Sequence, residues 1–400
     1  MSSTSGRVTL AFSCLGHAYM HLFTAFYFVI VLALEADWGV PYPDLIELWT
    51  LGALLVGVGA IPAGWLADRW SAAGMMVVMF VGLGLSGIAC AFLDTPTALL
   101  LGLSAVGLFS AIYHPVGIAW LVKSADRPGR ALGINGVFGS LGIAAAGITA
   151  GALIDLYDWR AAFLVPGLIS LATGIALFVC VRLGLVQEGA ARRAPPPASR
   201  SDMVRVFTIL LMTMLAMGII FQATQAAMPK VFDLRLRDLV GEGTFGIGAL
   251  VAVVYLVGGV MQVAGGYLAD RYALKPIYLA SWLFQVPVLI GIGLLSGLPL
   301  VVLAAMTVLL TAGALPAENL LLNRYSPDRH RSLAFGIKYV IAFGSAPLAL
   351  QLVAKMTALT GEFLWLFVAL AIMAAVATLV AALLPGGWRR QPEAAPALAE

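Results

Sequence analysis

The sequence predicts an all-α integral membrane protein with twelve transmembrane helices in two pseudo-symmetric six-helix bundles. First, 61% of the 400 residues are hydrophobic and only 11% are charged, whereas soluble domains carry about 25% charged residues. Second, the apolar residues fall into about twelve runs, each long enough at 1.5 Å per residue to cross a hydrocarbon core of about 30 Å. Third, residues 64–70 read Gly-Trp-Leu-Ala-Asp-Arg-Trp and return at 266–272 as Gly-Tyr-Leu-Ala-Asp-Arg-Tyr. Such a repeat indicates one design used twice.

The composition also limits the alternatives. The apolar runs do not alternate over about ten residues as the strands of a membrane β-barrel do. The 43 glycines suit helices that pack closely through small residues. Cys14, Cys90 and Cys180 all lie inside apolar runs, so we expect small buried side chains and neither a disulfide framework nor a metal site.

The first half, residues 1–183, is predicted to hold six helices. Four of them span residues 8–34, 45–66, 72–92 and 97–122, the fifth ends near residue 154 and the sixth near residue 182. A Pro-Tyr-Pro turn at 41–43 separates the first two, and the basic loop 123–130 follows the fourth. An Asp-Trp-Arg turn at 158–160 separates the last two.

The second half repeats this layout. Residues 184–202 are polar and proline-rich without periodicity, which is typical of a linker. The second bundle, residues 203–388, is predicted to hold helices at 203–228, 245–268, 276–295, 299–322, 332–356 and 363–384. Residues 389–400 form an Ala/Pro/Glu tail for which we expect no structure.

The charges predict how the chain is oriented. Lys and Arg gather in alternate connections, near residues 69, 123–130, 182–205, 271–275, 324–331 and 389–390, whereas the opposite loops are mostly acidic. By the positive-inside rule both termini and the linker are cytoplasmic, which fits a multi-pass protein of a bacterial inner membrane. The arginines are dispersed over many short loops, so we expect no nucleic-acid partner. We expect a monomer in the lipid bilayer.

The repeat extends beyond its first motif, because Asp126-Arg127 after the fourth helix is echoed by Asp328-Arg329 after the tenth. Across essentially its whole length the chain resembles the major facilitator superfamily (MFS), through the two Gly…Asp-Arg joints, these loops and the six-plus-six layout. Residues 107–115, Gly-Leu-Phe-Ser-Ala-Ile-Tyr-His-Pro, are similar to the fourth helix of fosmidomycin-resistance-type bacterial transporters. The fifth helix departs from the Gly-Pro motif of drug/proton antiporters, since Ala146-Gly147 and Ala150-Gly151 stand there instead.

The resemblance implies alternating access, in which two halves rock about a central site and cytoplasmic contacts form and break. Charges at the repeated joints are placed to act as this latch; the alternative is that they only anchor loops at the membrane surface. The predicted gating residues are Asp68, Arg69, Arg130, Asp270, Arg271 and Arg331.

Histidines mark the middle of the first bundle. His17 and His21 share one face of the first helix at i, i+4, and His114 precedes Pro115 at a similar depth of the fourth. Because imidazole changes charge near neutral pH, these residues could couple transport to protons; the alternative is neutral rings bonded to neighbouring helices. Three imidazoles also suit zinc, but no carboxylate or cysteine is placed at their level, so we expect no metal and no cofactor.

The second bundle carries a different chemistry. Glu318 and Asn319 on the tenth helix and Lys338 on the eleventh fall at similar depths, so Glu318 and Lys338 are expected to pair. A lysine released from this pair could hold an anionic substrate. Asn135 occupies the position equivalent to Lys338 in the first half. Gln222 and Gln225 are candidate hydrogen-bonding contacts for the substrate, or else join neighbouring helices.

Aromatic residues could line the path of an amphipathic substrate, although such residues more often pack against helices or lipid. The candidates are Tyr27, Tyr113, Phe138 and Tyr255.

Together these patterns predict a secondary transporter of a small organic solute, anionic or amphipathic, coupled to protons through His17, His21, His114 or Glu318. No Gly-x-x-x-x-Gly-Lys loop for ATP is present. Export is favoured over the alternative, proton-coupled uptake of an organic anion. We expect no enzyme, because the short loops offer no nucleophile or carboxylate cluster. A non-transporting receptor or assembly factor is the remaining alternative.

Overall fold

The computed structural model describes residues 4–125, 128–186, 200–325 and 331–385. Within this part of the chain, twelve helical segments are long and apolar enough to cross a membrane, as the sequence predicted. Large apolar side chains such as Ile61, 64% exposed, and Val260, 73% exposed, stand on the outer surface. Such side chains suit a surface that faces lipid tails rather than water.

The first half builds its six spans from helices that are often broken within one span. The bounds are α1 (Thr4–Ala25) with α2 (Tyr27–Trp38); α3 (Tyr42–Glu47), α4 (Thr50–Val58) and α5 (Ala60–Arg69); α6 (Ala72–Cys90); α7 (Pro96–Ser110), the π-helical turn η1 (Tyr113–Gly117) and α8 (Ile118–Ser124); α9 (Pro128–Leu156); and α10 (Trp159–Arg182). Side chains cap several starts. Asp158, for example, accepts bonds of 2.9 and 3.1 Å from the first backbone N–H groups of α10.

The second half is more regular. It contains α11 (Arg200–Arg235), α12 (Arg237–Val240), α13 (Phe245–Arg271), α14 (Leu274–Leu294), α15 (Gly297–Tyr325), α16 (Arg331–Gly344), α17 (Ala346–Thr360) and α18 (Leu364–Ala382). The spans lie at the predicted places, and most ends differ by a few residues.

Two helices, α3 and α11, differ in their bounds from the sequence prediction for physical reasons. The Pro-Tyr-Pro turn is itself the start of α3, because proline is tolerated in the first turn of a helix. Helix α11 begins at Arg200, inside the predicted linker, and continues past residue 228 because Val231 and Phe232 are buried. The cysteines are free as predicted, but Cys180 is only partly buried.

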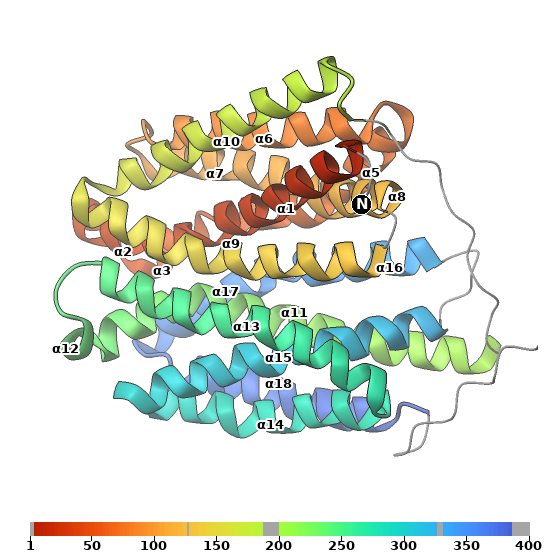
Figure 1. Cartoon of the computed structure of the whole chain (residues 1–400). Coiled ribbons are helices and arrows are strands. Elements are labelled where there is room, and N and C mark those ends of the chain that lie inside the picture. The colour runs from red at the N-terminus through yellow and green to blue at the C-terminus, as the bar shows by residue number, and fades with distance from the viewer. Residues whose placement is uncertain (1–3, 126–127, 187–199, 326–330, 386–400) are drawn as a thin grey trace, which may run out of the picture.

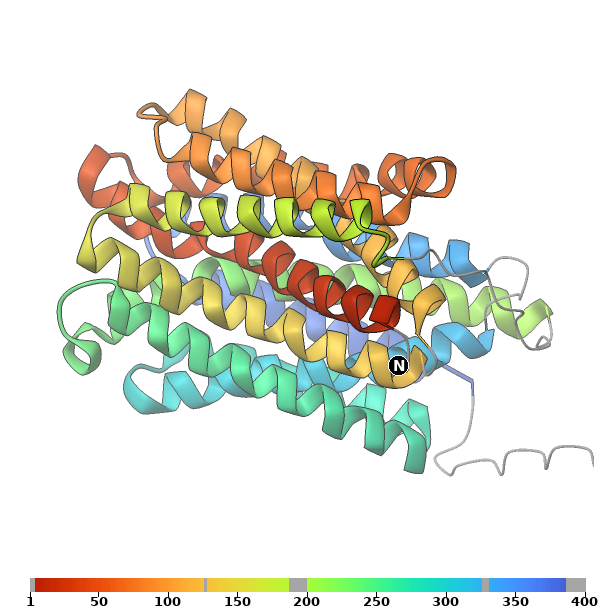
Figure 2. The same ribbon diagram turned by 45° about the horizontal axis from the view of Figure 1, so that its top comes forward.

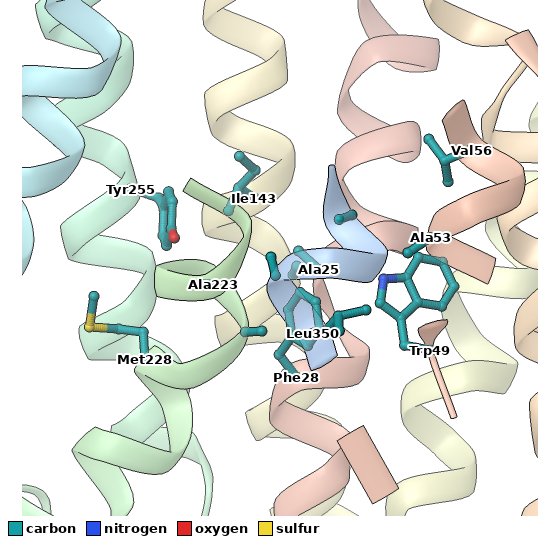
Figure 3. Packing of buried hydrophobic residues seen from close by; sticks show 14 of the residues in the cluster. Ala25, Phe28, Trp49, Ala53, Val56, Ile143, Ala223, Met228, Tyr255 and Leu350 are labelled. Carbon is teal, nitrogen blue, oxygen red and sulfur yellow. The ribbon is translucent and has the colours of Figure 1, made fainter. Parts of the chain in front are cut away.

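The two halves lie side by side, with the first half in red to yellow-green and the second in green to blue in Figures 1 and 2. Across their boundary α9 packs on α13, α4 on α16 and α17, and α2 on α11. One apolar cluster crosses this boundary and includes Phe28 and Trp49 from the first half with Ala223 and Leu350 from the second (Figure 3). The polar residues of interest therefore lie inside a continuous apolar body.

The fourth span contains a π-helical turn. Helix α7 ends at Ser110, and the π-helical turn of η1 follows before the helix resumes as α8. Pro115 has no N–H to donate, so the turn that contains it lacks one regular helical bond and can widen. Gly117 leaves room for the ring of Tyr113, since a Cβ there would lie 2.8 Å from Tyr113 Cδ2. The turn thereby places His114 toward the centre of the protein.

Candidate functional site

Three histidines of the first half come together where it meets α16 of the second half. The rings of His17 and His21 are 5.0 Å apart, and His114 lies 5.4 Å from His17 and 5.6 Å from His21. One ring nitrogen from each residue lies within 4.8 Å of one from each of the others. The structure thus gathers the three imidazoles that the sequence placed at one depth.

The orientation of His17 is fixed by helix α9. Its Nδ1 lies 2.8 Å from the backbone carbonyl oxygen of Asn135, and because a carbonyl can only accept, Nδ1 carries the proton of this bond. The Asn135 side chain accepts from the Tyr113 hydroxyl at 2.9 Å and donates to Ser13 at 3.3 Å. The Tyr113 ring stacks on His17 with centroids 4.8 Å apart. Asn135 and Tyr113 thereby hold the imidazole.

The second half covers the histidines through α16. The ring of His114 lies 4.4 Å from Phe343 and 5.2 Å from Tyr339. His21 lines a cavity of about 20 Å³ together with Gln222 and Gln225 of α11, among others. This volume is close to that of one ordered water, so an organic solute cannot occupy it until the halves separate.

A buried ion pair joins α16 to α15. Lys338 Nζ is 2.7 Å from Glu318 Oε1 and 2.5 Å from Asn319 Oδ1, and Lys338 and Glu318 are only 5% and 2% exposed. Tyr278 donates a 2.9 Å hydrogen bond to the second oxygen of Glu318. The pairing of Glu318 with Lys338 predicted from the sequence is confirmed.

The other predicted aromatic residues do not join this centre. Tyr27 is fully buried in the first half and donates a 2.7 Å bond to the carbonyl of Leu45, a structural contact. Tyr255 of α13 lies 6.3 Å from Phe221. Phe138 is partly buried on α9. Of the four aromatics predicted to line the path, Tyr113 is therefore the one in contact with the histidines.

Among the described residues, Asp68, Arg69 and Arg271 contact side chains of their own halves. Asp68 lies 3.9 Å from Lys123, and both are largely exposed. Arg69 stacks on Trp65 at 4.1 Å, and Arg271 on Tyr267 at 4.2 Å. The side chains of Arg130, Asp270 and Arg331 lie outside the described residues. The latch at the end that bears the termini stays a prediction.

At the opposite end, polar contacts join the halves, and sequence reasoning missed them. Asp155 of α9 accepts bonds from the Thr244 hydroxyl at 2.6 Å and from the backbone N–H groups of Thr244 and Phe245 at 2.8 Å, and so caps α13. Lys230 of α11 forms an ion pair with Glu35 of α2. Lys230 inside an apolar run was the available signal, since a cation near a membrane boundary requires a partner.

A larger cavity of about 620 Å³ lies between α13, α14 and α15. Its lining is almost entirely apolar, and Arg271 at its edge is the one charged side chain among the lining residues. It contains none of the histidines and neither member of the buried ion pair. We therefore place the candidate site at α16, between the histidines and the Glu318–Lys338 pair, and not in this cavity.

Comparison with known proteins shows which proteins the chain is similar to. The family model described as Major Facilitator Superfamily matches residues 13–298 and 239–399. The chain is 26% identical over 398 residues to the 4-hydroxybenzoate transporter PcaK of Pseudomonas aeruginosa, covering 89% of this chain and 87% of that protein. It is 24% identical over 400 residues to the protein of the same name from Pseudomonas putida, covering 87% and 86%.

Among solved structures, the fold is similar to that of a bacterial homologue of the human lysosomal transporter Spinster. For its inward-facing and occupied conformation the TM-score is 0.76 at 15% identity, over 98% of this chain and 100% of that one. For the inward-facing and unoccupied conformation the TM-score is 0.74 at 14% identity, again over 98% and 100%. At this identity the likeness concerns the fold alone.

Proposed function

This chain belongs to the Major Facilitator Superfamily, and from that premise we propose that it takes up a small aromatic carboxylate across the bacterial inner membrane together with a proton. As a member of this family it is a multi-pass membrane transporter of small molecules and not an enzyme. The substrate class, the proton and the direction are our proposal. The observation that carries it is the buried pair of Glu318 and Lys338.

The ammonium of Lys338 supports an anionic substrate. A charge inside a membrane protein is costly unless it is paired, so buried ionisable residues usually mark the path of a solute or ion. A substrate carboxylate could replace Glu318 at the Lys338 ammonium and keep it paired. The 26% identical relative is named a 4-hydroxybenzoate transporter, which agrees with a carboxylate substrate.

Aromatic side chains next to this ammonium favour a substrate with a ring. Tyr339 follows Lys338 directly in α16 and, with Phe343, contacts His114. Aromatic rings 4.5–7 Å apart attract each other by about 0.5–1.5 kcal/mol beyond the area that they bury. When the halves separate, these rings offer a flat apolar surface near the ammonium.

Glu318 is the group that we propose takes the proton. Two carboxylates beside a single ammonium in an apolar body cannot both stay ionised, because like charges in a shared site disfavour the second ionisation. When the substrate carboxylate binds Lys338, Glu318 is displaced and takes up a proton. Tyr278 and Asn319 remain nearby to hydrogen bond with the displaced carboxyl and with the ammonium.

This exchange favours uptake over the export expected from the sequence. The anion and the proton are bound at the same time, so both move in the same direction. A proton gradient directed inward would therefore drive accumulation inside. The histidines, which the sequence offered as alternative proton carriers, are not needed for this charge balance.

The test is accumulation in proteoliposomes that contain the purified protein, with labelled 4-hydroxybenzoate and an imposed pH gradient. We expect the wild type to accumulate substrate only when the outside is acidic. In Glu318→Gln the amide can still accept a bond from Lys338 but cannot take a proton. We therefore expect this variant to exchange labelled for unlabelled substrate and to lose accumulation by at least tenfold.

The controls separate the parts of the proposal. Lys338→Gln should lose both exchange and accumulation. Proton-driven accumulation by Glu318→Gln at the wild-type level would refute the role of Glu318. Accumulation driven by an outward proton gradient would refute symport. Binding of aromatic carboxylates without any exchange would instead favour a receptor.

A further inference from the structure

We propose that His17, His21 and His114 form a binding site for one divalent transition-metal ion of the zinc class. The three residues come from α1 and η1 of the first half. They share no contact with the Glu318–Lys338 pair, and the proposal does not depend on the transport mechanism above.

The spacing of the rings suits such an ion. An ion at the centre of a triangle with sides of 4.8 Å lies about 2.8 Å from each corner, whereas a zinc–imidazole bond is about 2.0–2.1 Å long. Movements of under about 1 Å in each ring would therefore complete the site. Side-chain rotation can supply such movements without a change of the backbone.

The imidazole ligands limit which metals the site can bind. Three histidines are the protein ligands of one well-known class of zinc site, which leaves a fourth position open for water or an anion. Imidazole suits zinc, copper, iron and nickel, whereas magnesium and calcium require oxygen ligands. Within the described part of the chain this group contains no carboxylate and no thiol. From the sequence, the lack of a carboxylate or cysteine argued against zinc. Because three histidines are enough for one class of zinc site, this lack does not exclude zinc.

The surroundings of His17 resemble those of a metal-bound histidine, whose other ring nitrogen is held by a hydrogen bond. Metal-bound histidines usually donate their other N–H to a carboxylate, a backbone carbonyl or a water. Nδ1 of His17 makes such a bond to the Asn135 carbonyl. This bond fixes the tautomer and leaves the lone pair on Nε2. The ring lies directly over Gly139, where a Cβ would come within 2.7 Å of Nε2.

The space beside the cluster fits an ion with a bound water. The cavity at His21 is about 20 Å³, and Thr24, Gln222 and Gln225 line it with polar groups. A polar cavity of this size holds about one water molecule. The cover provided by Tyr339 and Phe343 of α16 would shield the ion from bulk solvent.

The first measurement uses the wild-type protein alone, stripped with a chelator and freed of any affinity tag. We expect one zinc ion per chain and an X-ray absorption spectrum with imidazole nitrogens at about 2.0–2.1 Å. Cobalt should give the intense visible absorption of a tetrahedral site. A shell of six oxygens, or no retained metal, would overturn the proposal without the need for any variant.

Variants then assign the ligands. His114→Ala and His21→Ala should each weaken cobalt binding by at least tenfold, and Gly139→Ala should weaken it by displacing the His17 ring. His330, the fourth histidine of the sequence, lies outside the described residues, and His330→Ala is the matched control that should bind as the wild type does. If the variant with His17, His21 and His114 all changed to alanine bound cobalt as the wild type does, the assignment of these ligands would be wrong. Aromatic-carboxylate exchange, measured in parallel without metal, tests the transport proposal separately.

Discussion

The fourth and tenth spans are equivalent in the sequence repeat and differ in structure. His114-Pro115 in the first half lies in a π-helical turn between α7 and α8, whereas Leu315-Pro316 in the second lies inside the uninterrupted α15. A proline alone therefore does not decide whether a helix breaks, and its neighbours do. The broken span directs a histidine toward α16, and the continuous span carries Glu318 two residues beyond its proline.

The fifth and eleventh spans differ in the same way. Asn135 of α9 joins a neutral network with Tyr113, Ser13 and His17, whereas Lys338 of α16 is half of a buried ion pair. Duplication has kept the scaffold and divided the chemistry between the halves. At these two equivalent positions the first half carries an amide and the second half an ammonium.

The largest effect should follow from removing the charge that distinguishes the halves. Lys338→Ala leaves Glu318 buried without its ammonium, and breaking such a pair costs about 3–5 kcal/mol. We expect loss of substrate exchange and a clear fall in the melting temperature. Both are measured on the purified protein, by counterflow and by thermal unfolding.

The double variant Lys338→Ala with Glu318→Ala controls for this loss of stability. It removes both charges, so the melting temperature should return most of the way to that of the wild type while exchange stays absent. If exchange returned as well, Lys338 would have a structural role and no part in substrate binding.

The next largest effect should come from Pro115, and Pro316 serves as its matched control. Pro115→Ala restores a backbone donor and favours a regular helix in place of η1, which would turn His114 away from its neighbours. We expect exchange to fall about tenfold, because Tyr339 and Phe343, the proposed surface for the substrate ring, pack on His114 and small displacements of site residues are costly. Pro316→Ala in the continuous α15 should change exchange less than twofold. Equal effects of the two substitutions would remove the distinction drawn between these spans.

A smaller effect is expected from removing the helix cap at Asp155, and Asp158 serves as the comparison. Asp155 caps α13 across the boundary between the halves, and Asp158 caps α10 within one half. Loss of either cap to alanine costs about 1 kcal/mol. Spin labels on α9 and α13 at that end should report wider separations in Asp155→Ala and unchanged ones in Asp158→Ala. Unchanged separations in both would show that Asp155 does not hold the halves together.

The smallest effect is expected at Tyr27, a residue of the first half that lies apart from both clusters. Tyr27→Phe removes the hydrogen bond to the Leu45 carbonyl, which should reduce the free energy of unfolding by about 1 kcal/mol. Exchange should stay at the wild-type rate. A loss of exchange would return Tyr27 to the substrate path, where the sequence placed it.

Hydrophobic runs were enough to locate the spans, because length and apolarity are local properties. Pairing of Glu318 with Lys338 was also predictable, since the cost of an isolated charge requires a partner. The bond between Asp155 and Thr244 was not, because it depends on how the two halves meet. Neither was η1, since the same proline in α15 leaves the helix continuous. The predicted latch at Arg130, Asp270 and Arg331 stays a prediction.

Helix α16 places two consecutive residues against different partners, Lys338 against Glu318 and Tyr339 against His114. Neighbouring side chains on a helix point about 100° apart, so a rotation that frees one contact also disturbs the other. Occupancy at either location would then alter the affinity of the other by the same factor, as thermodynamic reciprocity requires. Because α16 would move as one helix, binding of the carboxylate substrate and binding of the metal ion would be coupled.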